Sequence, residues 1–430
     1  MQYKINRLLN GLRVLTVPMP QSESATLTVW VKTGSRNENK KVGGISHFLE
    51  HMVFKGSKKR PTAREISEVV DSIGGEFNAA TSKDWTNFYI KTRNANLDVA
   101  FDVLSDMVLN PILKEEEIER EKGTILQEIA MYEDTPVAKI GDVFEELAFE
   151  GNSLGWDTAG TADSVKRIIK NDFLSYRKLY YYPENMLVTL SGGISGKKSL
   201  ELARRYFEKN LLTHLGSELG LSRGGLFESV QDKPQVKIKT KQTDQCHFIL
   251  GFMGDGRNYK NRYAQGVLAT ILGGGMSSRL FIEVRERRGL AYAVKTGVER
   301  YQETGYVSTY VGTDPKKISE AIKVVLDEYS KITDHRSPIT DHELRKAKEY
   351  LKGHLALALE DTSAVNSFFG EQELFLDKVL TPEEIFKKVD AVSIDEIYTE
   401  AKRLFDITRC NLAIIGPFKD GSKFLKLLKS

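Results

Sequence analysis

The stretch VWVKTGSRNENKKVGGISHFLEHM, residues 29–52, decides the fold, because a related stretch returns in the second half of the chain. That relative is LGFMGDGRNYKNRYAQGVLATILGG, residues 250–274. In both, an alternating run typical of a strand leads through a turn with an Arg-Asn pair into a run with helical period. Further on, SEVVDSIGGEFNAATS resembles FIEVRERRGLAYAVKT, and a shift of 215 residues sets Phe77 opposite Tyr292. The recurrence of turn, helix and strand in one order predicts two homologous domains.

The boundary between these domains is expected where the pattern is lost. Residues 214–235, HLGSELGLSRGGLFESVQDKPQ, lack periodicity and are rich in glycine and serine, which is typical of a linker. We therefore expect a first domain over residues 1–215, a linker over 216–235 and a second domain over 236–430. At the N-terminus, Asn10-Gly11 between two alternating runs predicts a hairpin.

The composition is that of a soluble globular protein, with 40% hydrophobic and 28% charged residues in a chain of 430. The formal net charge of +3 is small and both signs are interspersed, unlike the dense basic surface of a nucleic-acid binder. No apolar run approaches the roughly 20 residues of a membrane span, and the N-terminus lacks a signal-peptide core. Cys246 and Cys410 have no partner spacing, which indicates buried thiols in a reducing compartment. We expect a cytoplasmic protein without nucleic-acid or membrane partners.

A candidate metal site lies in the first of the two repeats. His47 and His51 are four residues apart, so a helix places both on one face, with Glu50 beside them. Aligning Arg36 on Arg257 shows that the second repeat has apolar residues at these positions, namely Leu268, Ile271 and Leu272. Imidazoles on a core-facing surface need partners, and one metal ion supplies a partner for both. The alternative is a chance H-x-x-E-H on a surface helix, expected in about one such sequence in a hundred.

A catalytic zinc ion takes three protein ligands and keeps an open position for water. The stretch EREKGTILQEIAMYED offers Glu121 and Glu128, which two helical turns place on one face. Either carboxylate could reach the ion. Solvated glutamates on an acidic helix are the plain alternative, which is weaker for Glu128 because its neighbours are apolar.

The chain resembles the pitrilysin/insulinase family of zinc peptidases, the inverzincins, in four stretches: HFLEHMVFKGS, GGEFNAATS, EREKGTILQEIAMYED and LGGGMSSRLFIEVRERRGLAYAV. Residues 52–127 separate the second histidine from Glu128, which is the family's spacing to its glutamate ligand. The resemblance covers most of both domains and is that of a short, two-domain bacterial-type or processing-peptidase-like member. It implies an α+β fold in which each domain is a mostly antiparallel sheet packed with helices, as in processing peptidases and LuxS-type metallohydrolases.

The resemblance also implies a role for each site residue. One zinc ion per chain would be bound by His47, His51 and Glu128. Glu121 would support these ligands without touching the metal, and Glu50 would be the general base that takes a proton from the attacking water and passes it to the leaving amine.

The second domain would contribute an arginine–tyrosine pair, Arg285 and Tyr292, that binds the substrate backbone and stabilises the oxyanion. A solvated arginine and a core tyrosine are the alternatives. The edge strand of the first domain would pair with an extended peptide, so the substrate-binding residues would include Phe77, Asn78, Ala79 and Ala80. An ordinary sheet edge is the alternative there.

Larger members of this family join four such domains around a chamber, so the resemblance implies a homodimer of this chain. Arg285 and Tyr292 of one subunit would then face the zinc of the other. The expected function is a zinc metalloendopeptidase that cleaves short unstructured peptides inside a dimeric clamshell. Two alternatives stay open: a non-catalytic structural subunit of the respiratory-complex core type, and a specific presequence or cofactor-maturation peptidase.

Overall fold

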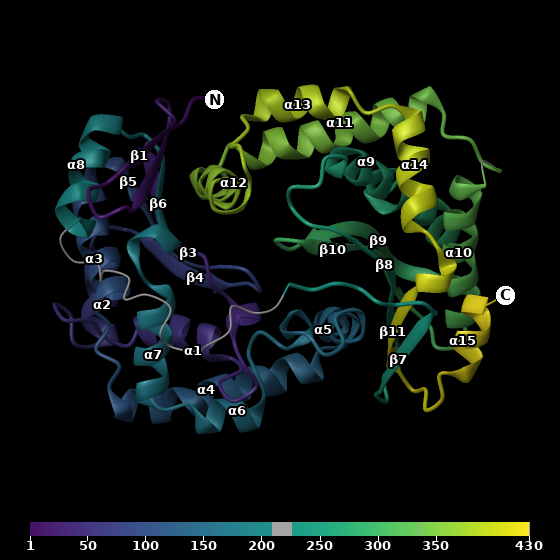
Figure 1. The fold of residues 1–430 in the computed structure, drawn as a ribbon, viewed down its shortest axis with the longest axis horizontal. Helices are drawn as coiled ribbons and strands as arrows, with labels where there is room; N and C mark the ends of the chain where they lie inside the picture. Colours follow the sequence, from purple (N-terminus) through teal and green to yellow (C-terminus); the bar gives the residue numbers. More distant parts are fainter. Residues whose placement is uncertain (209–225, 335, 430) are drawn as a thin grey trace. The chain divides into compact units, whose positions relative to one another are not determined.

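The computed structural model describes residues 1–208, 226–334 and 336–429 (Figure 1). The chain forms two compact units: the first comprises residues 1–130, 156–225 and 357–381, and the second comprises residues 131–155, 226–356 and 382–430. Residues 131–155 thus belong to the second unit, although the chain on either side of them belongs to the first. Conversely, residues 357–381 belong to the first unit, although the chain on either side of them belongs to the second. Half of the expected linker, residues 216–225, lies outside the described residues.

The first unit is built on a six-stranded sheet in the order β1-β2-β6-β3-β5-β4. Its strands are β1 (Lys4–Arg7), β2 (Arg13–Pro18), β3 (Ser24–Val31), β4 (Glu76–Thr81), β5 (Thr86–Arg93) and β6 (Met186–Gly192). All neighbouring pairs are antiparallel except β2 and β6. The pairing of β1 with β2 confirms the predicted N-terminal hairpin. Strand β4 ends the order, so one of its edges is unpaired within the sheet.

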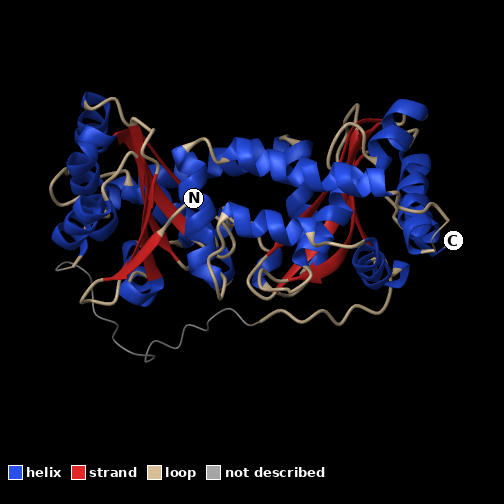
Figure 2. Cartoon of the chain, turned by 90° about the horizontal axis from the view of Figure 1, so that it is seen from above, coloured by secondary structure: helices blue, strands red, loops and turns tan. Residues whose placement is uncertain are grey.

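Helices cover both faces of this sheet (Figure 2). They are α1 (Ile45–Val53), α2 (Ala63–Ser72), α3 (Leu97–Leu109), most of α4 (Glu115–Asp134), α6 (Ala162–Arg167), α7 (Lys170–Tyr180), α8 (Gly196–Phe207) and α12 (Thr362–Phe375).

The second unit repeats this topology. Its strands are β7 (Gln235–Thr240), β8 (Cys246–Asp255), β9 (Ala291–Arg300), β10 (Thr304–Thr313) and β11 (Asn411–Gly416), in the order β7-β11-β8-β10-β9. The pair β7–β11 is parallel and the others are antiparallel, as in the corresponding part of the first sheet. The α+β class and the two homologous, mostly antiparallel domains are therefore confirmed.

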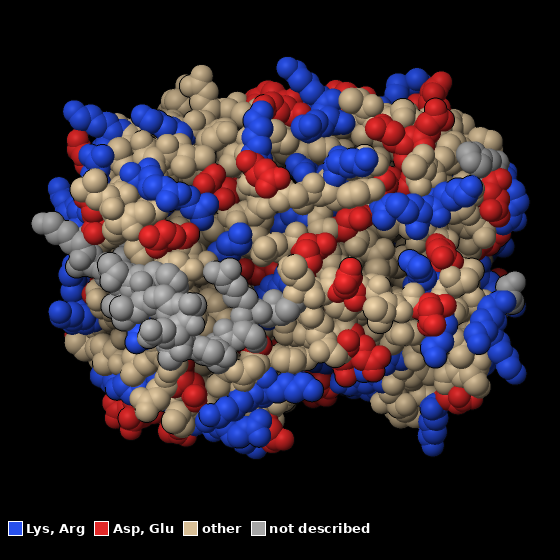
Figure 3. Space-filling model, in the orientation of Figure 1, with Lys and Arg blue, Asp and Glu red and all other residues tan. Residues whose placement is uncertain are grey.

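The helices of the second unit are α5 (Pro136–Ala148), α9 (Arg262–Gly273), α10 (Ile318–Thr333), α11 (Asp341–Ala358, for most of its length), α13 (Pro382–Asp390), α14 (Ile394–Leu404) and α15 (Ser422–Lys429), with a π-helical turn, η5 (Phe281–Arg287). None of the helices in the described parts of the chain is both long and apolar enough for a bilayer crossing. The face drawn in Figure 3 carries basic and acidic side chains side by side, as the sequence predicts.

The alternation along β3 explains how the first sheet has a core on each side. Leu27, Val29 and Val31 belong to the core shared with α1 and α3. The alternate residues, beginning with Thr26, face α12. There the Thr26 and Thr362 hydroxyls are 2.9 Å apart, and the Asn366 amide donates to the Thr26 carbonyl at 2.9 Å. Helix α12 thus completes this unit although it comes late in the chain. Helix α5 does the same for the second unit, where Phe144 and its neighbours pack on β8 and β11.

Close approach of α12 to the sheet requires a glycine. A Cβ atom on Gly370 would lie 2.8 Å from the indole of Trp30, which is fully buried. We expect Gly370→Ala to destabilise the protein by about 1–3 kcal/mol, because either the helix or the indole must shift. Gly123→Ala is the control, since no atom lies within 4 Å of the added Cβ in α4, and alanine should there stabilise the helix by up to about 1 kcal/mol. Urea unfolding of both variants checks this, and equal effects would contradict it.

Candidate metal centre

Helix α1 presents three polar side chains because its opposite face is buried. Phe48, Leu49 and Met52 lie in the core of the first unit. His47, Glu50 and His51 occupy the remaining face and are only partly buried. The predicted placement of these three residues on one side of one helix is therefore observed.

The start of α1 is held by backbone and side-chain contacts. Gly44 has φ of +92°, and a Cβ atom there would lie 2.5 Å from the Ala159 carbonyl oxygen, so glycine is required. The buried Glu38 carboxylate accepts from the backbone N–H of Gly44 at 2.6 Å and of Ser46 at 2.8 Å. The Ser46 hydroxyl also bonds the Tyr176 hydroxyl at 2.7 Å. These bonds set the direction in which α1 leaves the preceding loop.

Glu38 differs from most side chains that cap a helix, because its carboxylate is buried. Burial raises the pKa of Glu38 to about 7, although the hydrogen bonds from Ser46 and Gly44 act in the opposite direction. Both carboxylate oxygens accept backbone N–H groups that would otherwise be unpaired at a helix N-terminus. Nothing in the sequence motif pointed to this residue, because its contact depends on a loop folding back onto the helix.

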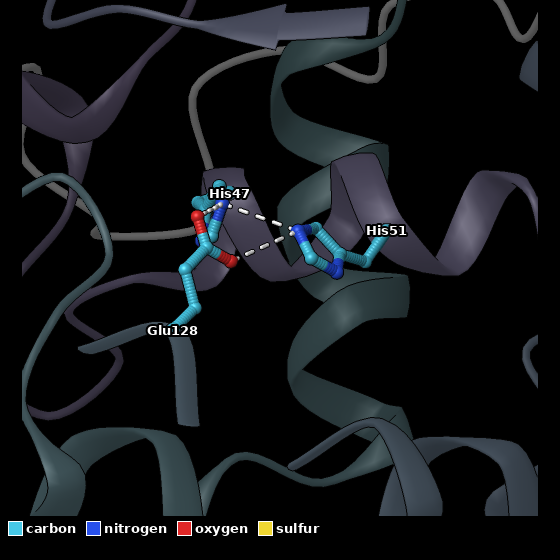
Figure 4. Close-up of side chains that lie close together, drawn as sticks. All are labelled: His47, His51 and Glu128. Atoms are coloured by element: carbon cyan, nitrogen blue, oxygen red, sulfur yellow. Dashed lines mark hydrogen bonds and ion pairs between the residues drawn. The ribbon is translucent and has the colours of Figure 1, made fainter. Parts of the chain in front are cut away.

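Helix α4 supplies the carboxylates. The shortest separations from Glu128 are 3.6 Å from Oε1 to Nε2 of His47 and 3.6 Å from Oε2 to Nε2 of His51 (Figure 4). The two Nε2 atoms are 3.2 Å apart. Two nitrogens bound to a tetrahedral zinc at the usual distance would be separated by about 3.3 Å. These three residues form one group of potential ligands, whose ligating atoms all lie within 4.8 Å of one another.

The ligand atoms of His47, His51 and Glu128 are arranged so that a positive charge between them is favourable. Nδ1 of His51 is 2.8 Å from Oε1 of Glu121, which assigns the ring proton of a neutral imidazole to Nδ1 and leaves a lone pair on Nε2. That lone pair faces Nε2 of His47 and the Glu128 carboxylate. Acceptor atoms that converge on one point repel one another unless a proton or a metal ion lies between them. The residues present therefore fit a zinc ion with two imidazoles, one carboxylate and an open position.

The electrostatics agree with this arrangement. Burial by itself would lower the pKa of His47, but the Glu128 carboxylate outweighs it and the net shift is upward. The same interaction with His47 lowers the pKa of Glu128. In the absence of a metal, the protonated form of His47 and the ionised form of Glu128 thus stabilise each other. The interaction keeps the Glu128 carboxylate in the ionised form that binds a metal ion.

Glu121 lies behind His51 rather than beside the potential metal position. Its second oxygen, Oε2, accepts from Nζ of Lys55 at 2.6 Å, and its side chain is 4% exposed. Burial would raise the pKa of Glu121, but the bonds from His51 and Lys55 overcome this and lower it. Of the two carboxylates left open by the sequence, the structure brings Glu128 to the ligand group and Glu121 to the far nitrogen of a ligand.

Strand β4 lies beside this helix. Phe77 and Ala79 are partly buried and pack on the core, whereas Asn78 and Ala80 are exposed. The last residue of the strand, Thr81, donates a hydrogen bond from Oγ1 to Oε2 of Glu50 at 2.5 Å. The sequence did not single out Thr81, because the contact depends on the packing of the edge strand against α1.

Arg285 and Tyr292 come together on the second unit. The Arg285 guanidinium carbon lies 5.8 Å from the centre of the Tyr292 ring and 4.8 Å from that of Phe281. Arg285 is exposed and Tyr292 is 78% exposed, so the alternative of a core tyrosine is wrong. Arg285 lies in the π-helical turn η5, a type of distortion frequent at functional sites.

Known proteins resemble the chain over most of its length. Residues 13–162 match the family described as Insulinase (Peptidase family M16), and residues 167–351 match the Peptidase M16 inactive domain. A zinc protease of Streptomyces coelicolor is 36% identical, over 96% of this chain and 89% of the relative. The zinc protease YmxG of Bacillus subtilis is 35% identical, over 95% and 97%.

Solved structures share the fold. A protease from Helicobacter pylori has a TM-score of 0.90 at 25% identity, covering 97% of this chain and all of the other. A chain of Complex III2 from Candida albicans has a TM-score of 0.82 at 20% identity, covering 99% of each, which shows the fold alone. Because curated zinc proteases match nearly the whole chain, and the donor set of α1 and α4 fits zinc, this chain belongs to the insulinase family of M16 peptidases and is a two-domain zinc metallopeptidase.

Proposed function

We propose that the chain is an endopeptidase for short unstructured peptides, with zinc bound by His47, His51 and Glu128 and with Glu50 as the general base. The observation that carries the proposal is the convergence of two Nε2 atoms and a carboxylate beside a glutamate on the same helix face. When bound, the zinc ion supplies a Lewis acid that acidifies water and polarises a carbonyl group.

The protein's own groups move the proton. Oε2 of Glu50 is occupied by the Thr81 hydroxyl, so Oε1 is the oxygen that accepts a proton from the attacking water. As the water oxygen bonds to the scissile carbonyl carbon and the C–N bond breaks, Glu50 passes this proton to the leaving nitrogen. Glu121 keeps His51 in the tautomer that directs Nε2 toward the ligand group.

The peptide is proposed to bind as an added strand on β4. No strand of the described residues pairs with the outer edge of β4, although the Ala79 N–H already donates to the Asn78 side chain at 2.9 Å. The small Ala79 and Ala80 side chains leave room for another backbone. Phe77 and Asn78 would lie along the same strand. Main-chain pairing explains why an extended, unstructured substrate would be required.

Arg285 and Tyr292 are proposed to bind the substrate backbone and the oxyanion from a second subunit of a homodimer. Their exposure on the surface of the second unit supports a role at an interface or toward a ligand. A guanidinium and a phenol are both suitable donors to a developing negative charge. A cytoplasmic location is part of this proposal, and the free buried thiols Cys246 and Cys410 suit a reducing compartment.

The narrower alternatives concern the substrate. A specific presequence or cofactor-maturation peptidase would use the same groups on one sequence, so a panel of unrelated peptides separates it from the general endopeptidase. A structural subunit would share the fold, as the Complex III2 chain does, without cleaving any peptide.

Glu50 can be tested as the general base by removing its charge. We expect wild-type protein to cleave a quenched unstructured peptide of about 20 residues, and Glu50→Gln to lose activity by at least about 100-fold because the amide cannot accept the proton. Zinc content, measured by mass spectrometry, should be equal in both. Glu116→Gln, in the exposed first turn of α4, is the matched control and should be fully active. Retained activity in Glu50→Gln would contradict the assignment.

The support that Glu121 gives to His51 can be tested through zinc affinity. Glu121→Gln should weaken zinc binding about 10- to 100-fold, because the amide cannot neutralise Lys55 and hold the His51 proton together. Competition with a zinc chelator measures the affinity, again with Glu116→Gln as control. Unchanged zinc affinity would show that Glu121 has no part in metal binding.

Mixed dimers test whether two subunits share one active site. Glu50→Gln and Tyr292→Ala proteins, each inactive, are mixed under conditions that exchange subunits. If each site combines the two domains of different subunits, random mixing restores about one quarter of wild-type activity, because half of the dimers carry one intact site. If each site is built from one subunit, no activity returns. A monomer by light scattering would also overturn the homodimer.

A further inference from the structure

The hydrogen bond between Thr81 and Glu50 joins two elements with different tasks. Glu50 lies on α1, whereas Thr81 is the last residue of β4. Oγ1 of Thr81 lies 2.5 Å from Oε2 of Glu50, and the described residues contain no other hydrogen bond to this carboxylate. A carboxylate with a single fixed oxygen keeps its other oxygen in a defined place.

The register of β4 makes this contact part of a wider one. Phe77, Ala79 and Thr81 alternate with exposed residues, so they share the face of the strand that meets α1 and the core. The Phe77 ring lies 5.4 Å from the ring of Phe54, which directly follows α1. Strand β4 therefore contacts this region at two places. Phe77 meets Phe54 at the C-terminal end of α1, and Thr81 meets the Glu50 carboxylate.

The turn that follows Thr81 is firmly held. The carbonyl oxygens of Ser82 and Lys83 accept backbone N–H groups of the loop before α1 at 3.1 and 3.0 Å. Within the same turn, Asp84 forms a buried ion pair with Arg36 at 2.9 Å. A buried ion pair that also has hydrogen-bonded surroundings is costly to separate. The backbone of Thr81 is thus fixed independently of Glu50, so its hydroxyl can act as a reference point.

We propose that Thr81 is a positioning residue for the general base: its hydroxyl holds Oε2 of Glu50, directs Oε1 to the attacking water, and ties the base to the strand that binds the peptide. The inference rests on the proposed function of Glu50 and β4. A peptide added to the free edge of β4 restrains the strand, and through Thr81 it restrains the carboxylate at the same time. Binding energy from the peptide backbone thereby serves the orientation of the catalytic group.

The test compares Thr81→Val, which keeps the shape and removes the hydroxyl, with Thr81→Ser, which keeps the hydroxyl. The matched control is Thr86→Val. Thr86 pairs with Thr81 across the hairpin, but its buried hydroxyl donates to the Thr33 carbonyl at 3.0 Å, away from Glu50. Thr81→Val should lower kcat about 10- to 100-fold with KM and zinc content unchanged, since misorientation of a catalytic group has effects of this size. Thr81→Ser should stay within about threefold of wild type, and Thr86→Val should lose stability but keep kcat.

A second readout does not depend on activity. In crystals of metal-free Thr81→Val, the Glu50 carboxylate should leave the position that it has in wild type, whereas in Thr81→Ser it should remain. Affinity of the metal-free variants for the peptide, by fluorescence anisotropy, should equal that of wild type.

Three results would overturn the inference: a wild-type kcat in Thr81→Val, an equal fall of kcat in Thr86→Val, or an unmoved Glu50 in the Thr81→Val crystals. If the wild-type kcat of Thr81→Val is accompanied by a raised KM, Thr81 is a peptide contact and not a positioning residue. If wild-type protein cleaves no peptide, the proposed function fails, and the position of Glu50 in the metal-free crystals still decides whether Thr81 holds it.

Discussion

The site depends on one constraint, which is that α1 must bury one face completely and keep its start fixed. Phe48, Leu49 and Met52 anchor the helix in the core, and the Glu38 carboxylate fixes its first turn through two backbone N–H groups. A ligand geometry tolerates errors of only a few tenths of an ångström. The three converging ligand atoms are therefore a consequence of packing around α1 as much as of the residues that carry them.

The two domains show how one fold serves two purposes. In the second unit the helix equivalent to α1 is α9, and its residues Leu268, Ile271 and Leu272 are almost completely buried. Where the second domain uses these positions for core packing, the first uses them for polar groups that need a cation. This face of α1 is partly buried, and the carboxylates of Glu121 and Glu128 supply partners for its imidazoles.

Each unit is completed by a helix from a distant part of the chain. Helix α12 covers the first sheet with buried hydroxyl and amide contacts, and α5 covers the second with aromatic packing. Folding of each unit thus requires long-range pairing, since neither sheet has its full cover within one contiguous segment. The Gly370 position, where the helix meets Trp30, marks how closely this cover fits.

The sequence by itself determined the elements and the kind of chemistry. The repeat predicted two homologous domains, and the family resemblance implied their α+β fold. The i, i+4 spacing of His47 and His51 with Glu50 between them predicted one metal-facing surface, because helical period follows directly from local geometry. Helical spacing left Glu121 and Glu128 as equal candidates, and the family resemblance implied that Glu128 is the ligand and Glu121 its support. The tertiary structure shows the contacts that each of them makes, and it alone revealed Glu38, Lys55 and Thr81. Such contacts join residues far apart in the chain, and the distance between them is set by how strands and helices pack, which no local pattern encodes.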